Sequence, residues 1–227
     1  MLLDSTATRY GVLCDDVEHE IEIRRSRFIT FLGRVEREDE AREFVDLVRS
    51  EHRSARHHCT AFVLGPDRML QRSNDDGEPA GTAGVPMLEA LTQFVRPGEQ
   101  SPDASDLVAV VVRYFGGVLL GAGGLVRAYS DSVSQALSRA RFATRQRMQV
   151  LGLAVPLDAV GRIENDLRNS VGVAVLSVNY SDAVAELEFA VADEATARER
   201  VDAQLAALTQ GEARVKELRR DWVDLSA

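Results

Sequence analysis

The spacing of apolar and polar residues divides the chain into segments with strand or helix periodicity. Residues 107–112 form an uninterrupted apolar run, mostly of β-branched side chains, bounded by polar residues. Such a run is typical of a strand buried on both faces. Further along, apolar side chains recur at the spacing of an amphipathic helix: Leu125, Tyr129, Val133, Ala136, Leu137 and Ala140. Residues 113–124 therefore connect a buried strand to a helix.

The segments before this strand predict a mixture of strands and helices. Residues 17–24 alternate between polar and apolar side chains, as a strand with one solvent-facing side does. A Gly-Pro-Asp sequence at 65–67 indicates a turn. In chain order, the pattern predicts strands at 17–24 and 27–35 around a turn at 24–26, a helix at 38–52, strands at 59–64 and 69–72, and a helix that opens near Pro86.

The last third of the chain has a different order of elements. The pattern predicts a strand at 148–155, a helix marked by Val160, Ile163, Leu167 and Val171, strands at 173–180 and 183–191, a helix at 194–208 and a strand at 213–218. This β-α-β-β-α-β order is the split βαβ, ferredoxin-like pattern. We therefore expect an α+β protein with two domains, residues 1–145 and 146–227, each with enough apolar residues for a core.

Five glycines occupy the junction between the buried strand and the next helix: Gly116, Gly117, Gly121, Gly123 and Gly124. Glycine lets the backbone approach another molecule closely, and a helix N-terminus offers unpaired N–H groups with a partial positive charge. The junction is thus a candidate anion site. The alternative is that the glycines serve only tight turns and close packing. The spacing lacks the lysine and hydroxyl of a Walker loop, and Val126 replaces the third glycine of a dinucleotide fingerprint.

An acidic loop between residues 73 and 84 is a second candidate for chemistry. Asp75, Asp76 and Glu78 place three carboxylates within four residues, and hard cations such as Mg²⁺ or Ca²⁺ prefer oxygen ligands. The order of the acidic residues does not match an EF-hand. The alternative is structural: Asn74 and Asp75 form an Asx-turn, and Thr82 helps to cap the following helix.

Two adjacent histidines and a cysteine, His57, His58 and Cys59, suggest a zinc ligand set or a nucleophile. Successive residues of a strand point to opposite faces, so only His57 and Cys59 can share a ligand. No spacing in the sequence supplies the further zinc ligands that such a site needs. The simpler interpretation is that Cys59 is a small core residue and that one histidine makes a local hydrogen bond.

Charge and composition restrict the partners. The net charge is −9, with 18 basic and 22 acidic side chains in residues 1–145 and 9 and 14 in residues 146–227. This argues against a nucleic-acid binder held by bulk electrostatics, although two local basic clusters occur, one of Arg24, Arg25 and Arg27 and one of Arg53, Arg56, His57 and His58. The sequence contains neither an apolar stretch of membrane-spanning length nor a signal peptide. We therefore expect a soluble, cytoplasmic protein without a membrane partner, and the two cysteines are consistent with a reducing compartment.

Taken together, the motifs resemble a known family. They occur in a fixed order: Ser26-Arg27-Phe28, His57-His58-Cys59, Asp75-Asp76-Gly77-Glu78-Pro79, Thr82-Ala83-Gly84, Arg113-Tyr114-Phe115-Gly116-Gly117, Gly121, Gly123-Gly124-Leu125-Val126-Arg127 and Tyr129. With them, the chain resembles the YigZ/IMPACT family. The resemblance implies an N-terminal domain with the fold of ribosomal protein S5 domain 2. It also implies a C-terminal ferredoxin-like domain similar to the last domain of elongation factor G.

Two functions from different classes follow. The eukaryotic members of the family resemble regulators of translation, so the first hypothesis is a translation-associated binding or regulatory protein. It would contact RNA, the ribosome or a protein partner through a groove near the glycines. The expected ligand- or anion-binding residues are the five glycines with Arg27, His57, His58, Arg113, Tyr114 and Arg127.

The alternative is a small-ligand or nucleotide-phosphate-binding enzyme, similar to a hydrolase or phosphotransferase. In it, Asp75, Asp76 or Glu78 would hold Mg²⁺ against a phosphate bound by the glycine-rich segment. We favour the first hypothesis because the sequence shows no complete catalytic set. The sequence leaves the oligomeric state, the partner and the ligand open.

Overall fold

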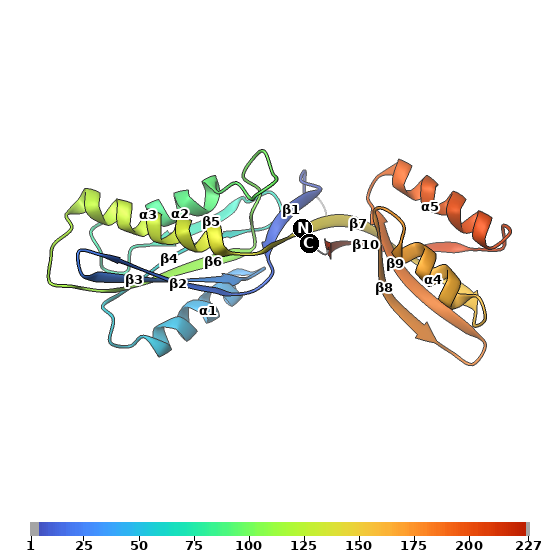
Figure 1. Cartoon of the computed structure of the whole chain (residues 1–227), viewed down its shortest axis with the longest axis horizontal. Helices are drawn as coiled ribbons and strands as arrows, with labels where there is room; N and C mark the ends of the chain where they lie inside the picture. The colour runs from blue at the N-terminus through green and yellow to red at the C-terminus, as the bar shows by residue number, and fades with distance from the viewer. Residues whose placement is uncertain (1–4, 226–227) are drawn as a thin grey trace. The chain divides into compact units, whose positions relative to one another are not determined.

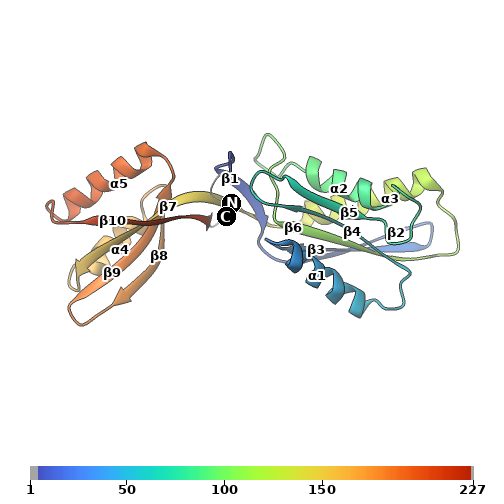
Figure 2. The same cartoon turned by 180° about the vertical axis from the view of Figure 1, so that it is seen from behind.

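A computed structural model describes residues 5–225 of the chain (Figures 1 and 2). The chain divides into two compact units, residues 5–144 and residues 145–225. Both combine an antiparallel sheet with helices, so the fold class is α+β, as the sequence predicts. None of the helices in residues 5–225 combines the length and apolar character that crossing a bilayer requires.

The N-terminal unit contains a five-stranded sheet and three helices. In chain order the elements are β1 (Arg9–Leu13), β2 (Val17–Ile23), β3 (Ser26–Arg34), α1 (Glu38–Glu51), β4 (His57–Leu64), β5 (Leu70–Asn74), α2 (Gly84–Gln93), β6 (Leu107–Tyr114) and α3 (Ala122–Arg139). The sheet order is β2-β3-β6-β4-β5, and the paired strands run antiparallel. The apolar run at 107–112 therefore becomes the central strand, and all six of its side chains are buried.

Helices cover both faces of this sheet. In Figure 1, α1 lies on one side of the strands, and α2 and α3 lie on the other. Strand side chains alternate between the two sides. In β6, Val108, Val110 and Val112 pack in the cluster with α1, whereas Ala109 and Val111 pack with α2 and α3. The same alternation along β4 directs successive side chains toward different helices.

The C-terminal unit has the predicted order of elements with different bounds. The elements are β7 (Phe142–Pro156), α4 (Val160–Arg168), β8 (Val173–Tyr180), β9 (Val184–Ala192), α5 (Ala195–Leu208) and β10 (Val215–Leu225). Strand β7 pairs with both β9 and β10, and β8 forms the edge beyond β9. Apolar side chains of α4 and α5 share one buried cluster with β7, β8 and β9.

Three bounds differ from the sequence-based expectation. Strand β7 begins at Phe142, six residues before the predicted start at 148, and the division between the two units, between Thr144 and Arg145, falls inside this strand. Helix α4 ends at Arg168, and Val171 is 92% exposed in a turn beside Gly172, whose φ is +78°. Strand β10 extends well beyond the predicted end because its pairing with β7 continues through a polar, exposed stretch. Hydrophobic periodicity does not reveal strand pairing in a polar stretch.

Candidate functional site

Two arginines form the tight turn between β2 and β3. Ile23 pairs with Ser26, so Arg24 and Arg25 are the two connecting residues, and their φ angles are +49° and +66°. Two successive positive φ angles define a type I′ turn, for which Asn-Gly is the favoured sequence. Larger side chains are strained there. Both side chains are exposed and have no bonded partner within residues 5–225. We call this pair the arginine turn.

The loop of residues 115–121 between β6 and α3, which we call the glycine loop, packs against the arginine turn. The Gly116 N–H donates to Ser26 Oγ at 3.2 Å. A Cβ atom at Gly116 would lie 2.0 Å from the carbonyl carbon of Arg25, a distance that backbone atoms cannot accommodate. Gly116 is therefore a packing glycine, and the two segments hold each other in place.

The remaining glycines of the junction have other reasons to be present. Gly117 and Gly121 adopt φ angles of +85° and +71°, which favour glycine. Gly124 has one close neighbour, since its Cβ would lie 3.1 Å from Leu120 Cβ. Gly123 has ordinary helical backbone, and an added Cβ would meet no atom within 4 Å. Neither packing nor backbone conformation explains the glycine at 123.

Arg113, near the end of the central strand, is buried with most of its hydrogen-bonding capacity unused. Its side chain is 7% exposed, and Nη1 donates to Glu78 Oε1 at 2.6 Å. The guanidinium carbon lies 5.5 Å from the ring centre of Phe28 and 5.7 Å from that of Phe115. Nε is buried and has no acceptor among residues 5–225. A buried donor without an acceptor is rare and calls for an explanation.

A buried polar chain leads from Glu78 into the core. Tyr129 donates its hydroxyl to Glu78 Oε1 at 2.8 Å, and Cys59 Sγ lies 3.3 Å from the Tyr129 oxygen. Burial raises the pKa of the Cys59 thiol to about 12, and it also raises the pKa of Tyr129 well above its ordinary value. A thiol with such a pKa stays protonated at neutral pH and is a poor nucleophile. These contacts fit the interpretation of Cys59 as a core residue.

The three carboxylates of the acidic loop point to different protein groups. Asp75 accepts the backbone N–H groups of Gly81, Ala83 and Gly84 at 2.8, 3.0 and 2.8 Å. Burial raises the pKa of Asp75, but these three bonds outweigh it, and the pKa lies below its ordinary value. Asp76 accepts the His58 N–H at 2.7 Å and an Arg49 N–H at 3.0 Å, and Glu78 faces Arg113.

These contacts bear on the two interpretations of the acidic loop, a metal site and a structural turn followed by a helix cap. Within residues 5–225, no group of three or more His, Cys, Asp or Glu side chains has the geometry to hold a metal ion. Asp75 caps α2, whereas the Thr82 hydroxyl donates to the Pro79 carbonyl, so the expected cap at Thr82 is wrong. The expected Asx-turn at Asn74 and Asp75 is confirmed, because Asn74 Oδ1 accepts the N–H of Asp76 at 2.8 Å.

The two histidines separate to opposite faces of β4, as strand alternation requires. His58 is buried, and its Nε2 donates to the His52 carbonyl at 3.1 Å. His57 is half-buried, and its Nδ1 donates to the Asp76 carbonyl at 2.9 Å. His57 pairs with Arg113 in the sheet, and Arg113 pairs with Phe28 on the other side. Only His57 therefore lies beside the candidate arginine.

Residues 54–57 and 113–115 enclose an open pocket of about 250 Å³, which we call the Arg113 pocket. It brings together His57, Arg113 and Tyr114 from the predicted set. The pocket also contains Arg56, a member of the second basic cluster of the sequence, which is exposed and without a bonded partner in the described chain. Sequence reasoning did not select Phe115, which is 51% exposed; its position two residues after Arg113 is the signal that would have identified it.

Two predicted arginines lie outside this pocket. Arg27 makes two bonds to Glu20, at 2.7 and 2.8 Å, and its guanidinium lies 5.4 Å from the Tyr114 ring centre. Arg127 lies in the first two turns of α3, where it is exposed and has no bonded partner among residues 5–225. The first turn of α3 contains neither a side-chain cap nor an acidic residue, which leaves its N–H groups available to an anion.

These features lie at one end of the N-terminal unit. The β2–β3 turn, the glycine loop and the start of α3 appear together at the left end of Figure 1 and at the right end of Figure 2. The contact between Gly116 and Arg25 joins the arginine turn to the glycine loop, and Phe115 joins the loop to the Arg113 pocket. The result is one continuous surface.

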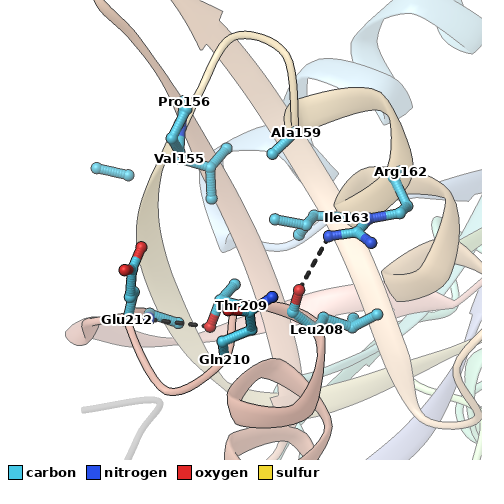
Figure 3. A pocket seen from close by; sticks show the side chains of 11 residues that line it. Val155, Pro156, Ala159, Arg162, Ile163, Leu208, Thr209, Gln210 and Glu212 are labelled. Atoms are coloured by element: carbon cyan, nitrogen blue, oxygen red, sulfur yellow. Dashed lines mark hydrogen bonds between the residues drawn. The ribbon is translucent and has the colours of Figure 1, made fainter.

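The C-terminal unit has a larger pocket of about 340 Å³ where the end of β7 meets α4 and α5 (Figure 3). Arg162 crosses it and donates to the Leu208 carbonyl at 2.9 Å. Thr209 Oγ1 accepts the N–H of Ala213 at 3.0 Å. Its arginine and its threonine hydroxyl are therefore both used within the chain.

The residues of this surface lie in the part of the chain that matches a known protein family. The profile of the Impact N-terminal domain matches residues 24–137, which include the arginine turn, the Arg113 pocket and most of α3. The chain belongs to the IMPACT family. It is 42% identical over 200 residues to the IMPACT family member YvyE of Bacillus subtilis (strain 168), covering 88% of this chain and 87% of that protein.

Two further comparisons agree. The IMPACT family member YigZ of Escherichia coli (strain K12) is 51% identical over 128 residues, which are 56% of this chain and 57% of that protein. A crystal structure described as that of a hypothetical protein superposes with a TM-score of 0.58 at 34% identity. That superposition covers 93% of this chain and 98% of the other.

Proposed function

We propose that the chain is a translation-associated binding protein and that the surface around the glycine loop binds single-stranded RNA. Arg24, Arg25, Arg56 and Arg127 contribute positive charges without bonded partners within the described chain. The planar fork of arginine suits phosphate, and an exposed aromatic ring such as Phe115 provides a stacking platform for a base. A locally basic end is compatible with a net charge of −9, because charges beyond about a Debye length are screened.

The observation that carries the proposal is the arginine turn. A two-residue hairpin turn with positive φ at both positions selects for asparagine and glycine, yet this chain places arginine at both. Such strain is characteristic of functional positions, where it costs on the order of 1–3 kcal/mol per residue. We infer that the two charges are retained at that cost because they bind a partner.

The fold supports a role in translation more weakly. We assign the C-terminal unit to the ferredoxin-like class, because the sheet neighbours β10-β7-β9-β8 and the two helices are those of a split βαβ domain. We assign the N-terminal unit, on the family resemblance, to the fold of ribosomal protein S5 domain 2. The resemblance links both folds to proteins of translation, but a fold alone does not define a function.

The test replaces the arginine turn with its favoured sequence. The double variant Arg24→Asn, Arg25→Gly should bind a short single-stranded RNA roughly tenfold more weakly, with a smaller salt dependence because two phosphate contacts are lost. The same variant should unfold at a higher temperature, because turn strain of about 1 kcal/mol or more is removed. Fluorescence anisotropy across a salt series measures the first effect, and thermal denaturation measures the second.

The matched control is Arg139→Gln, at the last residue of α3. This exposed arginine has no bonded partner in residues 5–225 and lies twelve positions from Arg127, about 18 Å along the helix. It removes one charge without touching the proposed surface, so affinity should stay within about twofold of the parent. Unchanged RNA affinity in the double variant would refute the proposal. A loss of affinity could not be attributed to misfolding, because the variant is expected to be more stable than the parent.

A further inference from the structure

Arg113 lines a pocket and uses one side-chain hydrogen bond within residues 5–225, and we propose that the Arg113 pocket binds a terminal phosphomonoester, either at the 5′ end of an RNA strand or on a free mononucleotide. The inference deepens the proposed RNA-binding function and rests on it for the strand-end source. An arginine has five N–H donors, and the one bond of Arg113 within residues 5–225 runs from Nη1 to Glu78. Nε is enclosed by protein atoms, so the unused donors that an oxyanion can reach are those of the terminal guanidinium nitrogens.

A second buried arginine shows what a purely structural role looks like. Arg68 also has a buried Nε without an acceptor, but its Nη1 and Nη2 donate to the carbonyls of Pro102 and Thr92, both at 2.7 Å. Both terminal nitrogens of Arg68 therefore hold backbone segments together. Arg113 holds one carboxylate, and it lines the pocket together with residues 54–57.

The neighbours of Arg113 pre-organise it for an anion. Glu78 fixes one nitrogen, and Glu78 is itself held by the Tyr129 hydroxyl. Phe28 and Phe115 restrict the guanidinium through their rings at 5.5 and 5.7 Å. Because Glu78 balances the charge of Arg113, the unpaired positive charge at the pocket comes from Arg56. A restrained guanidinium beside a free cation favours a group with high charge and several oxygens, which a phosphomonoester has.

Depth and volume favour a terminal phosphate over one inside a strand. An internal phosphodiester continues on both sides and carries one charge, so it binds best in an open groove. The Arg113 side chain is 7% exposed, and the pocket of about 250 Å³ has the volume of about eight water molecules. That space suits a phosphate with part of its sugar. The attached base would then lie near Phe115, which is 51% exposed and open to stacking.

The experiment compares three probes on the full chain: an eight-nucleotide RNA with a 5′-phosphate, the same RNA with a 5′-hydroxyl, and adenosine monophosphate. Anisotropy gives the RNA affinities, and calorimetry gives the mononucleotide affinity. We expect the 5′-phosphate to raise RNA affinity about tenfold, as charge-assisted hydrogen bonds would. We also expect the mononucleotide to compete for the 5′-phosphorylated RNA and not for the 5′-hydroxyl RNA.

Two variants assign the effect to the pocket. Arg113→Gln combined with Glu78→Gln removes both charges, so no buried carboxylate is left unpaired, and the preference for 5′-phosphate should fall to about one. If that variant does not fold, Arg56→Gln changes an exposed side chain and should reduce the preference about threefold. Arg139→Gln should leave the preference unchanged.

The outcomes separate this inference from the proposed function. If both RNAs bind equally well and the mononucleotide does not bind, the pocket inference is overturned and the RNA-binding surface stands. If neither RNA binds but the mononucleotide binds in an Arg113-dependent manner, the proposed function fails and the phosphate pocket stands on its free-nucleotide source. A 5′-phosphate preference that survives both pocket variants also overturns the inference.

Discussion

Two of the pockets of this protein differ in how their arginines are bonded. The pocket between β7, α4 and α5 in the C-terminal unit has a volume of about 340 Å³, yet its Arg162 donates to the Leu208 carbonyl and helps to tie α4 to the end of α5. The Arg113 pocket is smaller, at about 250 Å³, and its arginine is buried with Nε unsatisfied in the described chain. The volume of a pocket thus says less about function than the bonding state of the polar groups that line it.

The largest effect that can test this comparison comes from removing each arginine. Arg113→Gln leaves Glu78 buried beside an uncharged neighbour, and breaking a buried ion pair from one side costs about 3–5 kcal/mol. Arg162→Gln removes one bond of an exposed side chain to a carbonyl and should cost about 1 kcal/mol or less. Urea denaturation of both variants measures the difference. Equal losses of stability would show that the two arginines do not differ as described.

An intermediate effect on stability should distinguish two glycines of the strand–helix junction, Gly116 and Gly123. Gly116→Ala brings a methyl group against the Arg25 backbone and should cost about 1–3 kcal/mol, as overpacking does. Gly123→Ala meets no atom within 4 Å and should stabilise α3 by up to about 1 kcal/mol. Thermal unfolding measures both changes. A tolerated Gly116→Ala would mean that the glycine loop does not pack on the arginine turn.

The smallest effect concerns the loop that brings Glu78 to Arg113. Asp75→Ala removes the cap of α2 and should cost about 1–2 kcal/mol at neutral pH. The folded-state pKa of Asp75 is lowered, so its contribution is complete above its unfolded pKa and is lost as pH falls through the folded value. The difference between parent and variant should therefore be constant from pH 7 to about 5 and shrink below about pH 4. A difference that grows with acid would contradict this assignment.

Much of the fold was predictable from local patterns. The apolar run at 107–112 predicted a strand buried on both faces, and it is the central strand of the N-terminal sheet. The helical spacing from Leu125 to Leu137 predicted the buried face of α3. The periodicity of a strand or helix depends on residues close together in the sequence, so it can be recognised without knowing the surface that the element packs against. The limits of β7 and β10 were missed because they depend on pairing.

The site was less predictable, because its contacts join distant segments. Arg113 and Tyr114 were selected from the sequence, but the bond from Arg113 to Glu78 spans thirty-five residues. Asp75 was assigned to a metal or a turn, although it caps a helix nine residues later. Arg56 was noted as part of a basic cluster, but the sequence could not place it beside Arg113, and Phe115 was not selected as a site residue.

By itself, the sequence determined the order of the elements from β2 onward, the α+β class and, through its motifs, membership of the IMPACT family. The tertiary structure alone decided which polar groups satisfy one another: it paired Arg113 with Glu78, used Asp75 as a cap and gave His57 and His58 different carbonyl partners. The reason is physical. Periodicity records which face of an element is buried, whereas hydrogen bonds depend on which elements become neighbours, and sheet pairing sets this over long separations in the chain.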